Sequence, residues 1–102
     1  MEYGEFSSFL QDVNKNLEKA LEFAQNDNER TMIKKYIEHF KSGDINTHKD
    51  SQRAWIKDKS PIVESNIGWI EHYVDPSNKR ALWDGWVAIV DKERSKKFQA
   101  LV

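Results

Sequence analysis

The sequence has 102 residues, the length of one domain, and its 16 Lys and Arg residues against 17 Asp and Glu residues give a net charge of −1. This balance lacks the basic excess of a nucleic-acid-binding protein, and no apolar run is long enough to span a membrane, so we expect neither partner. The absence of cysteine excludes disulfides and thiolate metal sites and favours a cytoplasmic location.

Residues 5–60 are predicted to be helical. Apolar residues recur at steps of three and four over residues 6–24, and again over residues 32–40, which indicates two amphipathic helices. We expect Ser7 or Ser8 to cap the first helix, with Gln11 as the capping-box partner of Ser8. Asn26, followed three residues later by Glu29, is the predicted cap of the second helix.

A third, weaker helix is predicted to follow. Gly43 is predicted to end the second helix, and Asp44 can cap the next one. Pro61 is expected to close it, because the residue before a proline is pushed out of the helical region. One side of this helix is predicted to carry Ile45, His48, Trp55 and Ile56.

Residues 62–90 are predicted to form a β-hairpin. The two β-prone runs, residues 62–74 and 81–90, flank a turn cluster that begins at Asp75, which suggests a loop of about four or five residues. Gly85 within the second run indicates a bulge or a close backbone approach. Asp91 is expected to cap a final helix that begins within residues 91–102. The fold class is therefore α+β, and because a lone hairpin is marginally stable, we expect one module of a larger assembly.

The residues offer little for catalysis or metal binding. His39, His48 and His72 lie on three different predicted elements, and no two have the spacing of a zinc site on one helix. The charged stretch at residues 48–59 alternates in sign, which is typical of a solvated helix face. We therefore predict no metal site and no catalytic residue within this chain.

The first predicted strand carries the candidate binding site. With a side-chain period of two, Glu64, Asn66 and Gly68 share one face. The other face carries Val63, Ser65, Ile67 and Trp69. A carboxylate in an apolar strand needs a partner, which is either a free peptide amine or a Lys or Arg of the protein itself.

Two segments resemble one known family. The runs HKDSQRAWIKDKSPIVESNIGWIEHYVDP and WDGWVAIVDKERSKKFQALV are similar to the dipeptidyl peptidase III family, zinc-dependent exopeptidases that release dipeptides from peptide N-termini. The resemblance covers essentially the whole chain. It implies an internal lower-lobe segment of a two-lobed enzyme of roughly seven hundred residues, well beyond the usual size of one domain. The hairpin is then expected to belong to a larger β-barrel-like sheet.

The resemblance also implies roles for the strand residues. Glu64 matches the glutamate that binds the substrate's terminal amine, and Asn66 matches a position that lines the peptide subsites; Gly68 completes this face. The family's zinc-binding motifs lie outside this chain, so zinc is expected only in the parent enzyme, and the chain alone is expected not to hydrolyse peptides. The expected partners are short peptides and the remainder of the parent polypeptide. The alternative is a stand-alone or self-associating protein-interaction module.

Overall fold

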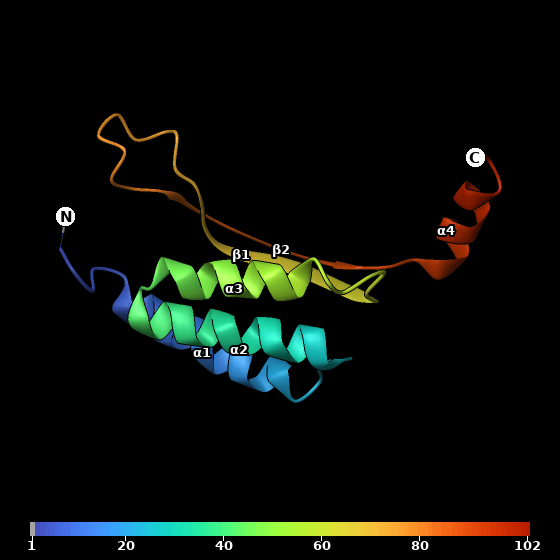
Figure 1. Cartoon of the computed structure of the whole chain (residues 1–102), viewed down its shortest axis with the longest axis horizontal. Helices are drawn as coiled ribbons and strands as arrows, with labels where there is room; N and C mark the ends of the chain where they lie inside the picture. The colour runs from blue at the N-terminus through green and yellow to red at the C-terminus, as the bar shows by residue number, and fades with distance from the viewer. Residues whose placement is uncertain (1) are drawn as a thin grey trace. The chain divides into compact units, whose positions relative to one another are not determined.

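The computed structural model describes residues 2–102, which form two compact units, the first ending at Lys59 and the second beginning at Ser60. Residues 2–102 contain four helices and one antiparallel pair of strands, so the predicted α+β class is confirmed (Figure 1). The sheet has two strands in the described residues, and the larger barrel-like sheet is not seen there. The elements are α1 (Ser7–Leu21), α2 (Asp27–Ser42), α3 (Ile45–Trp55), β1 (Val63–Glu71), β2 (Leu82–Ile89) and α4 (Lys92–Gln99).

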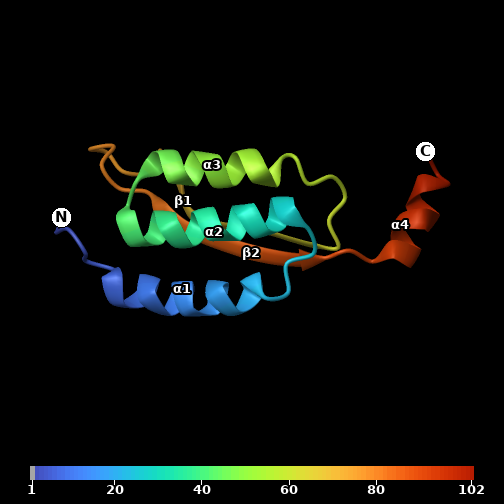
Figure 2. The same cartoon turned by 60° about the horizontal axis from the view of Figure 1, so that its bottom comes forward.

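The first unit is a layer of three helices in which α2 lies between α1 and α3 (Figure 2). This central position explains why α2 supplies most of the buried apolar side chains. They recur at helical spacing and are Met32, Ile33, Tyr36, Ile37 and Phe40. The unit is therefore organised around one helix that is covered on two sides.

Three predicted helix boundaries are confirmed. The Asn26 side chain accepts the backbone N–H of Glu29 at 2.9 Å and caps α2. Gly43 ends this helix in the left-handed conformation, with φ of 74°, and its N–H donates to the carbonyl of His39. Asp44 then caps α3 by accepting the backbone N–H of Asn46 at 2.9 Å. Each cap satisfies a backbone group that the helix itself leaves without a partner.

The predicted cap of α1 is wrong. The helix begins directly after Phe6, which makes no side-chain capping bond, and Ser7 and Ser8 are already helical, so Gln11 completes no capping box. The chain enters α1 from a tight turn instead, where the N–H of Ser7 donates to the Gly4 carbonyl at 3.0 Å. At the start of α1 a backbone carbonyl, and not a serine hydroxyl, therefore accepts an N–H group that the helix leaves unpaired. The helix ends at Leu21, shorter than its apolar pattern.

The buried side of α3 also differs from the prediction. Of the four residues predicted to share one side, His48 and Trp55 are half-buried, whereas Ile45 and Ile56 are 54% and 58% exposed. The buried residues of the helix are Thr47, Ser51 and Ala54. These small side chains recur at steps of four and three and form one continuous stripe. An apolar count misses such a stripe because two of its members are polar. The helix ends at Trp55 and does not continue towards Pro61.

The second unit contains the hairpin, with register pairs from Val63 opposite Ile89 to Glu71 opposite Leu82. Its loop covers residues 72–81 and is longer than predicted, because Asp75 organises it. The Asp75 carboxylate accepts the backbone N–H groups of Lys79 and Arg80 at 2.7 and 2.9 Å. These bonds hold together a loop that extends well beyond a tight turn.

The hairpin's irregularity lies in β1 and not at Gly85. The register shifts between Trp69 and Glu71, so the predicted bulge at Gly85 is wrong. The atoms close to Gly85 belong to a side chain and not to another backbone segment: a Cβ added at Gly85 would lie 3.3 Å from Cγ1 of Ile67. After β2, Asp91 accepts the N–H of Arg94 and caps α4 as predicted. Among the described residues, no helix is both long and apolar enough to cross a membrane.

Candidate functional site

The hairpin register completes the face that carries Glu64. Residues directly opposite each other in an antiparallel pair point to the same side of the sheet. The face therefore contains three β1 residues and their three partners on β2, and we call it the polar face: Glu64, Asn66, Gly68, Asp84, Trp86 and Ala88. The β2 residues Asp84 and Trp86 were missed by sequence reasoning, since only the register assigns them to this side.

Glu64 is half-buried, and its direct partner across the sheet is Ala88. Its neighbour along the strand on the same face is Asn66, an uncharged amide. No Lys or Arg of residues 60–102 forms an ion pair with the Glu64 carboxylate. A carboxylate forms its strongest hydrogen bonds with charged donors, so this position suits the ammonium group of a ligand.

Gly68 is the buried member of the polar face and has a φ of 149°. Residues with a Cβ rarely adopt this backbone conformation, so the strand itself requires glycine here. Its register partner Asp84 accepts the N–H of Gly85 at 2.8 Å, which engages one oxygen of that carboxylate locally. Between Glu64 and Gly68, Asn66 lies opposite Trp86. The predicted site residues thus share one face. The backbone conformation alone explains why position 68 is a glycine.

The opposite face of the hairpin is apolar. Trp69 and Trp83 are register partners whose rings meet edge to face, with centroids 5.2 Å apart and planes at 71°. This arrangement matches the preferred geometry of aromatic pairs. Farther along the same face of β2, Val87 and Ile89 are 72% and 76% exposed.

Sequence reasoning placed the three histidines on separate elements and missed that two of them meet. The rings of His39 on α2 and His48 on α3 have centroids 5.2 Å apart. Nδ1 of His39 lies 2.9 Å from the Asp44 carbonyl oxygen, to which it donates. Within residues 2–102 no three His, Cys, Asp or Glu side chains cluster as a metal site requires. The residues present therefore do not fit a zinc ion.

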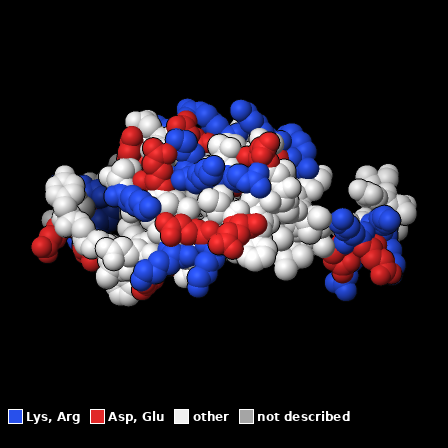
Figure 3. All heavy atoms as spheres, turned by 90° about the horizontal axis from the view of Figure 1, so that it is seen from below, with Lys and Arg blue, Asp and Glu red and all other residues white. Residues whose placement is uncertain are grey.

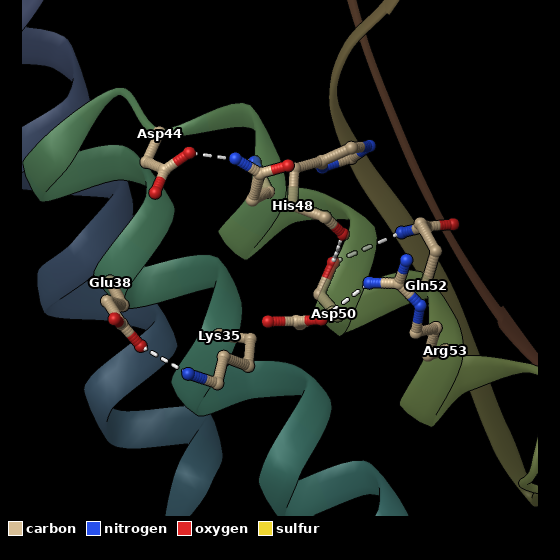
Figure 4. A network of polar contacts seen from close by, with 9 residues as sticks. Lys35, Glu38, Asp44, His48, Asp50, Gln52 and Arg53 are labelled. Carbon is tan, nitrogen blue, oxygen red and sulfur yellow. Dashed lines mark hydrogen bonds and ion pairs between the residues drawn. The ribbon is translucent and has the colours of Figure 1, made fainter.

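The charged stretch of α3 has the character of a solvated helix face. Arg53 and Asp50 form an ion pair at 2.6 Å, and Lys35 and Glu38 on α2 form another at 2.7 Å (Figure 4). The hydrogen bond that Lys35 donates to the Glu38 carboxylate is the main reason why the pKa of Lys35 lies above its ordinary value. Positive and negative groups alternate over the surface seen in Figure 3. Such exposed pairs contribute little to stability and mark no anion site.

Comparison with known proteins gives matches along the whole chain. Residues 1–102 match the model of peptidase family M49. The chain is 54% identical to dipeptidyl peptidase 3 of Dictyostelium discoideum and 48% identical to that of Homo sapiens, in each case over 97% of this chain. The enzyme of Nematostella vectensis is 46% identical over the same share. The chain spans only 13–14% of the length of these relatives.

Proposed function

The chain belongs to peptidase family M49, and on this premise we propose that it forms the part of a dipeptidyl peptidase that holds the N-terminus of a substrate peptide. In this proposal Glu64 binds the peptide's free α-amino group, while Asn66 and Gly68 line the adjoining subsites. The chain is then one module of a larger two-lobed cytoplasmic enzyme, whose remainder completes the cleft.

The position of Glu64 is the observation that carries the proposal. Glu64 is half-buried, lies opposite Ala88 in the register and has no Lys or Arg partner within residues 60–102. The alternative that a cation of the hairpin neutralises it therefore finds no support. A peptide ammonium group supplies up to three N–H donors and a full positive charge, and a charge-assisted hydrogen bond contributes about 1.5–3 kcal/mol.

The strand geometry also suits a peptide. An extended peptide can add to a sheet edge through main-chain hydrogen bonds, while its alternate side chains meet the residues of one face. The hairpin has two strands in the described residues, so each strand has one edge that the other does not pair. We propose that further strands of the enzyme extend this hairpin into a barrel-like sheet and that the peptide lies against β1.

The chemical step belongs to other parts of the enzyme. The side chains of residues 2–102 do not fit a zinc ion, so we assign to this chain no part in activating water or cleaving the peptide bond. Zinc would be held by the parent enzyme elsewhere. The isolated chain is accordingly expected to release no dipeptide from a peptide substrate.

Replacing Glu64 in a full-length enzyme that carries this segment tests the proposal. Glu64→Gln keeps the size and removes the charge, and we expect KM to rise roughly ten- to hundred-fold, the equivalent of one charge-assisted hydrogen bond. Glu71→Gln is the matched control, because Glu71 is on the same strand beyond the register shift. An unchanged KM for Glu64→Gln, or an equal rise for both variants, would contradict the proposal.

A second candidate function is an interaction module that binds a second copy of the chain. The exposure of Val87 and Ile89 on the apolar face of β2 favours it. Sedimentation of the isolated chain distinguishes the two proposals. A monomer at high concentration would contradict the interaction module, and a dimer that Val87→Lys converts to monomer would support it.

A further inference from the structure

A pair of histidines lies where α2 and α3 pack together. His39 is 8% exposed, and its ring centroid is 5.2 Å from that of His48. Tyr36 and Phe40, both buried on α2, extend this cluster: the Phe40 ring lies 5.2 Å from His39, and the Tyr36 ring lies 6.2 Å from His48. The contact between the two helices is therefore built partly from titratable rings.

The hydrogen bonds fix one ring and leave a nitrogen of the other without a partner. His39 carries its proton on Nδ1, because this atom donates to the Asp44 carbonyl at 2.9 Å. Nδ1 of His48 is buried and has no hydrogen-bond partner among the described residues. A neutral imidazole tolerates this, since its unprotonated nitrogen need not donate. The charged form carries a proton on both nitrogens and would bury an N–H group without an acceptor.

The charged groups nearby do not favour a proton on His48. On α2 the ionisable side chains that face it are His39 and Tyr36, and neither carries a negative charge at neutral pH. The Glu38 and Asp50 carboxylates are paired with Lys35 and Arg53, and Figure 4 shows the His48 ring directed away from both pairs.

Tyr36 gives little compensation for a charge on His48. Its ring is 6.2 Å away and tilted by 49°, so a cation–π contact would be weak.

We propose that the His39–His48 pair is a proton-sensitive contact, through which mild acid loosens the packing of α3 against α2.

The direction of the effect agrees with the electrostatics of the site. Burial, followed by the nearby His39, lowers the pKa of His48 below its ordinary value of 6.5. A depressed pKa in the folded state means that the unfolded chain binds the proton more readily. The stability contributed by neutral His48 is thus complete above pH 6.5 and falls as the pH decreases towards the folded-state value.

The test uses histidine ring NMR signals and thermal unfolding of the full 102-residue chain. The ring signal that His48→Phe removes identifies His48, and we expect it to titrate below pH 6.5, the ordinary value of a histidine. The thermal midpoint of the helical signal should fall between about pH 7.5 and about pH 5.5, and His48→Phe should remove roughly half of that fall or more. His72→Phe is the matched control and should leave the fall unchanged.

Two results would overturn the proposal. One is a titration of His48 at or above pH 6.5. The other is a folded His48→Phe variant whose thermal midpoint falls with acid as much as that of the unaltered chain. If His48→Phe does not fold, His48→Gln gives the assignment, and the titration of His48 in the unaltered chain decides alone.

Discussion

Glu64 on β1 lies directly opposite Ala88 on β2, so the carboxylate faces a methyl group across the sheet and not a cation. This pairing leaves room for a positive charge from outside the hairpin. A cation introduced at position 88 would compete with that charge for Glu64, because side chains directly opposite in an antiparallel pair have Cβ atoms about 4.5–5.5 Å apart.

Replacing Ala88 with Lys should supply the missing cation. In a full-length enzyme we expect Ala88→Lys to raise KM by up to about five-fold, since an opposite-charge cross-strand pair contributes about 0.2–1 kcal/mol that a peptide amine must displace. Ala88→Met, with a long uncharged side chain, is the control for size. Equal values of KM for the Lys and Met variants would show that charge at Glu64 plays no part.

Gly68 and Gly85 should respond differently to an added methyl group. Gly68→Ala forces a Cβ onto a backbone with φ of 149°, and we expect a loss of about 1–2 kcal/mol in the free energy of unfolding. Gly85→Ala should cost less, because the atom that it meets belongs to the half-buried side chain of Ile67, which can shift. Denaturant unfolding can be followed through the exciton coupling of the Trp69–Trp83 pair. A larger loss for Gly85→Ala would contradict this account.

The hairpin also shows how far the sequence can be interpreted. The alternation along β1 was enough to put Glu64, Asn66 and Gly68 on one face, because a period of two follows from the backbone alone. Their partners Asp84 and Trp86 depend on the register, and the register depends on the loop. The loop was underestimated because the Asp75 carboxylate bonds to the backbone of Lys79 and Arg80, an arrangement with no simple signature in the sequence.

In the helices, too, some features could be predicted from the sequence and others could not. Asn26, Gly43 and Asp44 were predictable, since capping needs one residue type at one position. The first cap failed because the carbonyl of Gly4 could substitute for a side chain. The prediction for the buried side of α3 failed because burial there depends on small size, as in Ser51, and not on hydrophobicity.

Asn14 on α1 forms a hydrogen bond to α2, and we expect an apolar residue at this position to be tolerated. Its Nδ2 donates to the Ile37 carbonyl at 3.2 Å, while its buried Oδ1 has no partner among the described residues. Asn14→Leu removes both groups and should leave the unfolding free energy within about 1 kcal/mol of the original. Asn14→Asp places a carboxylate against that carbonyl and should cost about 2–4 kcal/mol at neutral pH. Equal stability of the two variants, measured by urea unfolding, would contradict this ranking.

The loop at Asp75 should lose its order only in strong acid. Backbone bonds from Lys79 and Arg80 and the Ser77 hydroxyl lower the pKa of Asp75 from 3.8 to about 2. Because the folded-state pKa is depressed, the loop's stability is complete above pH 3.8 and is lost as the pH falls through about 2. The amide NMR signals of Lys79 and Arg80 should titrate in this range, and Asp75→Asn should abolish the change. Titration at or above pH 3.8 would exclude the carboxylate as their acceptor.

The central claim is that Glu64 recognises a peptide's free amine, and the most direct measurement compares two forms of one peptide. Affinities for the free-amine and N-acetylated forms are measured by calorimetry on a full-length enzyme depleted of metal, so that no turnover occurs. We predict a preference of roughly ten-fold or more for the free amine, abolished in Glu64→Gln and kept in Glu71→Gln. A Glu64→Gln enzyme that still prefers the free amine by the original factor would contradict the claim.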